Sequence, residues 1–295
     1  MKTIGITCSA LVKQYGIDRT FRLCKESGFN AVDFGLDSLY RLGDDVYGGS
    51  DDAFESHFDM IKRKAAEYEL IISQTHGRCC PYHPNDEAYN RNTDKLNALD
   101  LRATAHLGAP ACVIHFLESS AWGKKSPEVM HEQTTRMFDA ALPYAEQYKV
   151  SIAMETFGAA RIKGARIRDF FADPTEFKRQ FDRLNTTYKT ICVDTGHTHE
   201  AESFWVPAPE DMIRMLGKDI SVLHLHDNNG HWDDHLLPGM GNIHWDSVFD
   251  ALDDVGYSGV YNFELGIKYG ILNEDFVRFA GQYLRKFVDC RGRIK

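Results

Sequence analysis

The strongest constraint on the fold is a repeated alternation of two kinds of segment along the chain. Short runs rich in apolar and β-branched residues are followed by longer amphipathic stretches, eight times over, without a linker rich in Pro, Ser or Gly. Such alternation is typical of parallel strands joined by crossover helices. Eight strands of this kind close a (β/α)8, or TIM, barrel, which takes about 250 residues. We therefore predict an α/β fold, with residues 1–295 forming a single TIM-barrel domain.

The eight predicted strands are short and apolar. They span residues 3–8, 31–34, 71–76, 112–116, 151–155, 190–194, 221–226 and 260–264. Helices are predicted between them wherever apolar residues recur at helical spacing, as from Phe54 to Tyr68. Helix starts are predicted at Ser126-Pro127 and Asp173-Pro174, where a capping side chain precedes a proline. A last helix is predicted to place the aromatic stripe Phe276, Phe279, Tyr283 and Phe287 in the core.

Composition excludes several classes of protein. A formal net charge of -9 disfavours nucleic-acid binding through a global basic field. No apolar run approaches the roughly 20 residues of a membrane helix, and the N-terminus enters a strand instead of a signal peptide. The seven cysteines are odd in number and never spaced Cys-x-x-Cys, which argues for a reducing compartment. We therefore expect a cytoplasmic protein with no membrane partner.

Polar residues concentrate where the predicted strands end, which is where TIM barrels carry their working residues. Every strand from the third to the eighth contributes at least one. The residues are His76, His115, Glu155, Asp194, His197, His224, His226 and Glu264. A single inward histidine is as often a hydrogen-bonded core group as a ligand. Six consecutive strands that share the pattern indicate a functional site.

Three carboxylates in this set require a counter-charge. Glu155, Asp194 and Glu264 each follow an apolar strand, where an unpaired carboxylate is costly to bury. One alternative is a set of internal salt bridges to Arg78, Arg161 and Arg166, which lie nearby in the sequence. The favoured alternative is a metal ion. Several oxygen ligands with one imidazole suit Mn²⁺, Mg²⁺ or Co²⁺, with Zn²⁺ as a further option.

Two histidines on the seventh strand leave the nitrogen ligand open. His224 and His226 are alternate strand residues and are predicted to share a face. Around them lie Asp194-x-x-His197, His224-x-x-Asp227 and Asp233-x-His235-x-x-x-Gly239. Together with the glutamates that close the fifth and eighth strands, these motifs make the chain resemble the xylose-isomerase-like TIM barrels over nearly its whole length. That superfamily contains sugar and sugar-phosphate isomerases and epimerases, and the endonuclease IV nucleases.

The resemblance implies a role for each motif residue. The metal ligands would be Glu155, Asp194, His224 and Glu264, with the His-x-x-Asp match favouring His224 over His226. Glu155 and Glu264 would also be catalytic, exchanging a proton with the carbon next to a metal-polarised carbonyl. Substrate-binding roles are expected for His76, His115, His197, His226, Arg161 and His235. The ketohexose 3-epimerase branch carries an arginine and a glutamate where this chain has Gly230 and Arg161, so we do not place the chain in that branch.

These residues predict a metal-dependent sugar or sugar-phosphate isomerase or epimerase, with a small-molecule sugar as its partner. The alternative is an endonuclease IV-like, multi-zinc phosphodiesterase acting on DNA, in which Asp233 and His235 hold a second metal. Acidic residues in the strand-end loops disfavour that alternative, because they would repel a phosphate backbone. A noncatalytic sugar-binding barrel would not require two facing glutamates. A homo-oligomer is expected from the resemblance alone.

Overall fold

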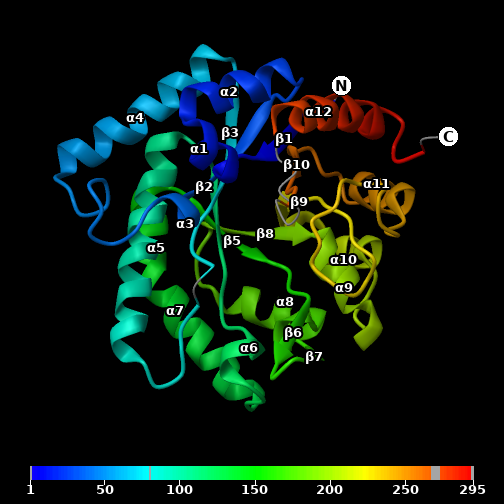
Figure 1. Ribbon diagram of the computed structural model, residues 1–295. Coiled ribbons are helices and arrows are strands. Elements are labelled where there is room, and N and C mark those ends of the chain that lie inside the picture. Colours follow the sequence, from blue (N-terminus) through cyan, green and yellow to red (C-terminus); the bar gives the residue numbers. More distant parts are fainter. Residues whose placement is uncertain (1, 80, 267–272, 294–295) are drawn as a thin grey trace.

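The computed structural model describes residues 2–79, 81–266 and 273–293. Its centre is a sheet of eight parallel strands in the order β10-β1-β2-β3-β4-β5-β8-β9, surrounded by helices (Figure 1). Leu225 and Phe263 form a parallel bridge between the chain after β9 and β10, which brings the two ends of the sheet together. This architecture confirms the predicted α/β TIM barrel.

All eight predicted barrel strands are present. They are β1 (Ile4–Thr7), β2 (Ala31–Gly35), β3 (Ile71–His76), β4 (Ala111–Ile114), β5 (Ser151–Glu155), β8 (Lys189–Asp194), β9 (Ile220–His224) and β10 (Tyr261–Phe263). Most are buried along nearly their whole length, as expected for parallel strands covered by helices. The predicted ends differ by up to two residues. Leu225 and His226 leave the regular ladder after His224, and β4 ends at Ile114 instead of at residue 116.

Helices connect the strands on the outside of the barrel. They are α1 (Ser9–Tyr15), α2 (Ile17–Glu26), α3 (Leu36–Leu39), α4 (Asp51–Glu67), α5 (Glu87–Leu107), α6 (Ser119–Trp122), α7 (Pro127–Tyr148), α8 (Pro174–Arg183), α9 (Thr195–Ala201), α10 (Pro209–Leu216), α11 (Trp245–Asp254) and α12 (Glu274–Asp289). The side chains of Ser126 and Asp173 accept hydrogen bonds from the first turns of α7 and α8, as their sequence predicts.

The predicted aromatic stripe of α12 is wrong in one position. Phe287 is buried, but the Phe279 side chain is 53% exposed. The buried face is formed instead by small and aliphatic residues such as Ala280 and Leu284. Gly281 sets this orientation, because a Cβ atom there would lie 2.0 Å from the carbonyl oxygen of Ser27. The helix packs closely against the end of α2 on that side and leaves Phe279 outside.

A hairpin that was not predicted from the sequence follows β5. Its strands β6 (Ala159–Ile162) and β7 (Ala165–Arg168) pair antiparallel through a turn at Lys163 and Gly164, which both have positive φ. Each strand is short, half exposed and rich in arginine and alanine, so it lacks the apolar run that marks a buried strand.

Two further features of the structure concern membrane-spanning helices and cysteines. No helix within the described residues is long and apolar enough to cross a membrane. The six described cysteines are free thiols, and Cys80 lies outside the described residues.

Candidate metal centre

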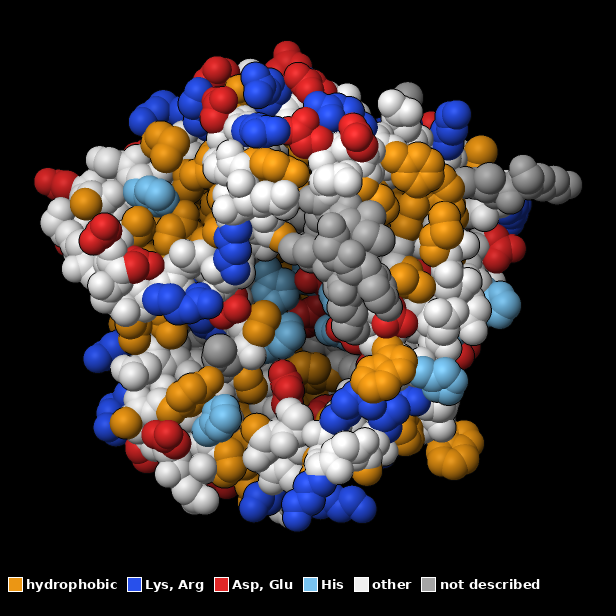
Figure 2. All heavy atoms as spheres, in the orientation of Figure 1, with side chains coloured by type: hydrophobic (Ala, Val, Ile, Leu, Met, Phe, Trp, Pro, Cys, Tyr) orange, Lys and Arg blue, Asp and Glu red, His pale blue; other side chains and the backbone are white. Residues whose placement is uncertain are grey.

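The predicted site residues gather at the C-terminal ends of the barrel strands. Figure 2 shows a hollow near the middle of this face, with histidine and acidic side chains at its floor. A cavity of about 340 Å³ there is lined by Thr7, Asp233, His235 and Glu264, among others. Closure of the barrel brings these residues together although they are far apart in the sequence.

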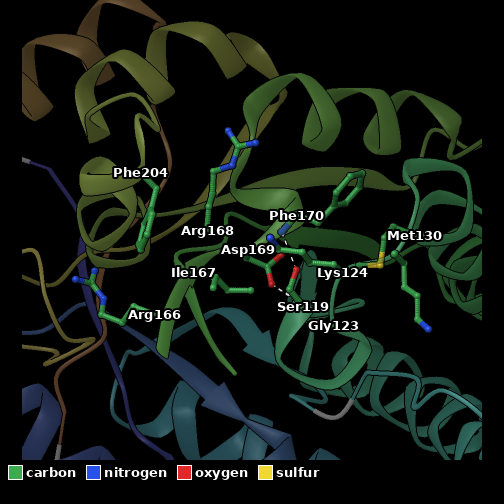
Figure 3. A pocket seen from close by; sticks show the side chains of 11 residues that line it. Ser119, Gly123, Lys124, Met130, Arg166, Ile167, Arg168, Asp169, Phe170 and Phe204 are labelled. Atoms are coloured by element: carbon green, nitrogen blue, oxygen red, sulfur yellow. Dashed lines mark hydrogen bonds between the residues drawn. The ribbon is translucent and has the colours of Figure 1, made fainter. Parts of the chain in front are cut away.

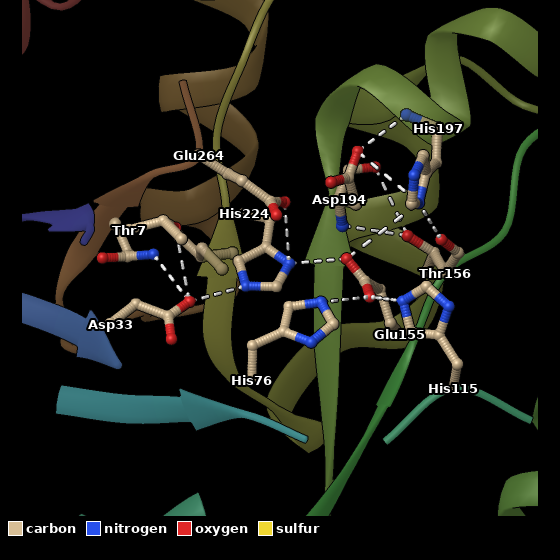
Figure 4. A network of polar contacts seen from close by, with 12 residues as sticks. Thr7, Asp33, His76, His115, Glu155, Thr156, Asp194, His197, His224 and Glu264 are labelled. Atoms are coloured by element: carbon tan, nitrogen blue, oxygen red, sulfur yellow. Dashed lines mark hydrogen bonds and ion pairs between the residues drawn. The ribbon is translucent and has the colours of Figure 1, made fainter. Parts of the chain in front are cut away.

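Four side chains form the centre of this site (Figure 4). One ligand atom each from Glu155, Asp194, His224 and Glu264 lies within 4.8 Å of the other three. His224 Nδ1 is 2.5 Å from Glu155 Oε1 and 3.3 Å from Glu264 Oε2. Three of the side chains are at most 1% exposed, and that of Glu264 is 18% exposed. These four are the residues predicted as metal ligands.

The three arginines that are the alternative partners of these carboxylates are engaged elsewhere. Arg78 pairs with Asp100 at 2.7 Å, and both Arg161 and Arg166 approach Glu200, at 3.4 and 3.7 Å. Among the described residues, no lysine or arginine lies within 4.0 Å of Glu155, Asp194 or Glu264, whose ion-pair partners are all imidazoles. The salt-bridge alternative is therefore excluded for this part of the chain. Three carboxylates and one imidazole make a donor set that suits a divalent metal ion.

The electrostatics of the centre also favour a cation. Burial by itself lowers the pKa of His224, but the charges around it, including Glu264 and Glu155, raise this pKa well above its usual value. Burial raises the pKa of Glu155, yet the charge of His224 and hydrogen bonds from His115 and His224 bring it well below its usual value. Without a metal, protons on the imidazoles supply the positive charge that these carboxylates require.

Asp33 contacts the imidazole of His224 at Nε2, the nitrogen that does not face Glu155 and Glu264. His224 Nε2 is 2.9 Å from Asp33 Oδ2, which also accepts hydrogen bonds from the amides of Gln74 at 3.2 Å and Asn262 at 3.3 Å. A histidine that ligates metal through one nitrogen usually donates its other N–H to a carboxylate in this way. With Nε2 so engaged, Nδ1 faces Glu155 and Glu264. Asp33 was not predicted from the sequence, because it lies inside β2 and not at its end.

Replacing Asp33 by asparagine is expected to weaken metal binding by about 10- to 100-fold, because the imidazole loses its charged hydrogen-bond acceptor. Isothermal titration of the metal-free protein with Mn²⁺ measures the change. Asp59→Asn, on α4 and 3.4 Å from His106, is the matched control and should bind as the wild type does. Unchanged affinity in Asp33→Asn would show that Asp33 does not orient His224.

A second group of side chains lies on the Asp194 side of the centre. His226 Nε2 is 3.0 Å from Asp194 Oδ2, and the His226 ring stacks on that of His235 at 4.0 Å. His235 Nε2 is 2.8 Å from Asp233 Oδ2, which is 3.7 Å from His197 Nε2. One ligand atom each from His226, Asp233 and His235 lies within 4.8 Å of the others. His226 therefore belongs to this group, and His224 to the first.

A third group lies on the Glu155 side. Glu155 Oε2 is 2.7 Å from His115 Nε2 and 3.7 Å from His76 Nε2. Cys79 Sγ is 3.7 Å from His76 Nδ1, so a thiol that was not predicted as a site residue borders the site. Burial lowers the pKa of His115, but nearby negative charges and hydrogen bonds to Glu118 and Glu155 raise it to about 10.

Arg161 is the one predicted site residue that lies apart. It is on the hairpin strand β6, where it approaches Glu200, donates to the carbonyl oxygen of His231 at 3.0 Å and stacks on Trp232 at 3.7 Å. Within the described ranges, it makes no ion pair with Glu155, Asp194 or Glu264. In this structure Arg161 ties the hairpin to the loop after β9.

Sequence comparison identifies the family. Residues 21–279 match the family described as xylose isomerase-like TIM barrel. The chain belongs to this family. The match confirms the resemblance drawn from the strand-end motifs.

Curated relatives of this xylose isomerase-like chain carry no assigned function. The uncharacterized protein MJ1311 of Methanocaldococcus jannaschii is 39% identical over 254 residues, which cover 78% of this chain and 83% of that protein. The uncharacterized protein y4fM of Sinorhizobium fredii is 28% identical over 180 residues, covering 60% of this chain. The matched region spans only 53% of the length of y4fM.

Solved structures share the fold of this xylose isomerase-like barrel. A D-tagatose 3-epimerase-like protein superposes with a TM-score of 0.75 at 18% identity, over 98% of this chain and 97% of the other. The IOLI protein with a binding zinc atom superposes with a TM-score of 0.75 at 17% identity, over 100% of both chains. At such identities the likeness establishes the fold alone.

Asp227, and Gly196 between Asp194 and His197, have structural roles in this family member. Asp227 Oδ1 and Oδ2 accept hydrogen bonds from the backbone of Asn228 and Gly239, and Oδ2 also from the Trp245 indole, so Asp227 organises the loop after β9. Gly196 leaves room for His226, because a Cβ atom at residue 196 would lie 1.9 Å from His226 Cε1.

Gly196→Ala is therefore expected to displace His226 and to destabilise the fold by about 1–3 kcal/mol, the usual cost of overpacking. Urea unfolding measures the loss. Thr198→Ala, two residues further along α9, removes a buried hydroxyl and methyl group without adding an atom, so it should leave the His226 ring in place. A Gly196→Ala protein as stable as the wild type would show that this close approach is easily relieved.

Proposed function

We propose that this protein is a metal-dependent isomerase or epimerase of a sugar or sugar phosphate. The observation that carries the proposal is the convergence of Glu155, Asp194, His224 and Glu264 at the strand ends, with no arginine or lysine of the described chain to neutralise them. The family membership supports it, and so do fold neighbours named D-tagatose 3-epimerase-like protein and L-ribulose 3-epimerase.

The four residues would hold one divalent ion. Their oxygen-rich set favours Mn²⁺, Mg²⁺ or Co²⁺, and the zinc atom in the IOLI structure keeps Zn²⁺ as an alternative. Such an ion, when bound, supplies a Lewis acid that polarises a sugar carbonyl. Asp33 orients His224 for this role.

Glu155 and Glu264 would transfer the proton. They reach the same imidazole nitrogen of His224 from β5 and from the end of β10, so both carboxylates border one point in the hollow. One carboxylate removes a proton from the carbon beside the carbonyl, and the other returns a proton to the neighbouring position or to the opposite face. His115, 2.7 Å from Glu155, helps to keep that carboxylate ionised.

The histidines around the centre would bind the sugar hydroxyls. His76 and His115 border Glu155, whereas His197, His226 and His235 border Asp194 and Asp233. Imidazoles donate hydrogen bonds and, when neutral, also accept them, which matches the hydroxyl groups of a sugar. Arg161 would act only through an extended substrate that reaches the hairpin.

Solvent hydrogen exchange tests this function without knowledge of the product. The protein is incubated in D₂O with a panel of ketoses, aldoses and their phosphates, and deuterium beside the carbonyl is measured by NMR. We expect exchange with at least one sugar, its loss after EDTA treatment and its return on adding Mn²⁺. Absence of exchange across the panel in the metal-loaded protein, or exchange that EDTA leaves unchanged, would contradict the proposal.

A multi-metal phosphodiesterase is the second candidate, and the two flanking groups of ligands favour it. His76 and His115 share Glu155 with the first centre, and His197, Asp233 and His235 form a further group beside Asp194. Adjacent metals held there would activate water and stabilise a leaving oxygen. Metal-dependent nicking of duplex DNA by the zinc-loaded protein would support this candidate over the isomerase.

A further inference from the structure

A groove separate from the metal centre lies beside the hairpin (Figure 3). Its volume is about 510 Å³, and it is enclosed by residues of the segment 119–125, by β7 and by Phe204 at the end of the 3-10 helix η2 (Glu202–Phe204). A groove of this size accommodates a small organic molecule. None of the residues assigned to the metal centre lines it.

Positive charge is concentrated around the groove although the chain as a whole carries a net charge of -9. Lys124 and Lys125 line it from the segment before α7, and Arg166 and Arg168 line it from β7. Arg168 pairs with Asp173 at 3.1 Å. Within the described ranges neither lysine has a carboxylate within 4.0 Å, and both side chains are exposed. The two lysines therefore remain available to an anion.

The acidic residue in the groove is committed to the backbone. Asp169 is buried, and its two oxygens accept hydrogen bonds from the amides of Ser119 at 2.6 Å and Phe171 at 3.0 Å. Burial raises the pKa of Asp169 to about 6, against these hydrogen bonds. Asp169 thus fixes the segment that begins at Ser119 to the end of the hairpin, and so builds the groove, instead of neutralising the lysines.

The remaining wall is apolar. Ile167, Phe170 and Phe204 are half-buried and Met130 is buried, with Phe204 and Arg166 at one end of the groove (Figure 3). The guanidinium of Arg166 lies 5.4 Å from the centre of the Phe204 ring. An apolar wall with cations around it is complementary to a molecule that has an apolar body and an anionic group.

We propose that this groove is a binding site for a planar organic anion, of which an aryl phosphate is the simplest example. The anionic group meets Lys124 and Lys125, which act as point charges for phosphate, and the ring packs on the apolar wall. The site stands independently of the isomerase proposal, because it shares no residue with the metal centre. It lies close to that centre, since Glu118, next to Ser119, approaches His115 Nδ1 at 3.6 Å.

Titration calorimetry with 1-naphthyl phosphate tests the site. We expect one molecule to bind per chain, more tightly than either inorganic phosphate or 1-naphthol. Inorganic phosphate lacks the aromatic ring, and 1-naphthol lacks the anionic group. Lys124→Glu/Lys125→Glu should weaken binding by at least about tenfold, since both charges are reversed. Phe204→Ala should weaken it by about fivefold. Both lysines are exposed, so circular dichroism should show the variant folded.

Two controls distinguish binding in the groove from binding elsewhere on the protein. Lys62→Glu/Lys286→Glu changes the net charge equally at exposed positions on α4 and α12, on the opposite side of the barrel from the hairpin in Figure 1, and should bind as the wild type does. Binding should also persist after EDTA treatment. Loss of 1-naphthyl phosphate binding after EDTA treatment would assign the phosphate to the metal centre and overturn the proposal. Equal affinity of the two double variants, or an affinity for inorganic phosphate equal to that for 1-naphthyl phosphate, would also overturn it.

Discussion

Glu155→Gln and Glu264→Gln are each expected to lower the incorporation of solvent hydrogen into the product sugar by about 10²- to 10⁴-fold, the usual contribution of general acid–base catalysis. Glutamine keeps an oxygen that can ligate metal but does not accept the proton. Each glutamate is needed for one half of the transfer, so either substitution alone should suffice. The measurement is the rate of deuterium incorporation from D₂O, followed by NMR with the metal-loaded protein.

Two further variants separate proton transfer from metal binding. Glu202→Gln changes a half-buried glutamate that contacts His199 outside the centre, and should exchange at the wild-type rate. Asp194→Ala removes a proposed ligand that is not assigned to proton transfer, and should lose metal together with exchange. Full incorporation of deuterium into the product sugar by either Glu155→Gln or Glu264→Gln would rule out a mechanism that uses both glutamates.

Arg78→Met is expected to destabilise the fold by about 3–5 kcal/mol, because it leaves a buried carboxylate without its cation. Arg78 is 2% exposed and makes two hydrogen bonds to Asp100, at 2.7 and 2.8 Å, and one to the carbonyl oxygen of Tyr40 at 2.9 Å. Arg78 thereby links the chain after β3, next to His76, to the C-terminal end of α3. Urea unfolding monitored by circular dichroism gives the free energy of unfolding.

Surface and double variants serve as controls for Arg78. Arg102 pairs with Asp51 and Glu55, whose side chains are 83% and 48% exposed, so Arg102→Met should cost only about 0–1 kcal/mol. Arg78→Met/Asp100→Leu removes both buried charges and should regain part of the stability lost in Arg78→Met. A loss in Arg78→Met no greater than that in Arg102→Met would contradict a stabilising role for the buried pair.

The barrel was predictable because most of its strands contain an apolar run and end in a polar residue. Runs such as Ile152-Ala153-Met154-Glu155 indicate both a buried strand and a candidate functional residue at its end. Closure of the barrel then brings residues that are far apart in the sequence close together, as for Glu155 and Glu264. The grouping of the three carboxylates followed from fold class and strand ends together, whereas His224 as the fourth ligand was implied by the family resemblance.

Other features depend on contacts that no local pattern records. Asp33 looks like an ordinary acid within a strand until barrel closure brings His224 Nε2 to 2.9 Å from it. The choice between His224 and His226 depends on how the chain leaves the ladder after β9, which strand alternation alone does not specify. The hairpin of β6 and β7 is held by Arg161 and Arg166, whose partners lie in α9 and the loop after β9.

The number and identity of metal ions bound per chain distinguish a single-metal isomerase or epimerase from a multi-metal phosphodiesterase. Inductively coupled plasma mass spectrometry on the protein, purified without chelators, gives both values. One Mn²⁺, Mg²⁺ or Co²⁺ per chain, lost in His224→Ala and retained in His76→Ala, is the result expected for the isomerase or epimerase. Three zinc ions per chain, with fewer in both His76→Ala and His235→Ala, would contradict this account and establish a multi-metal centre.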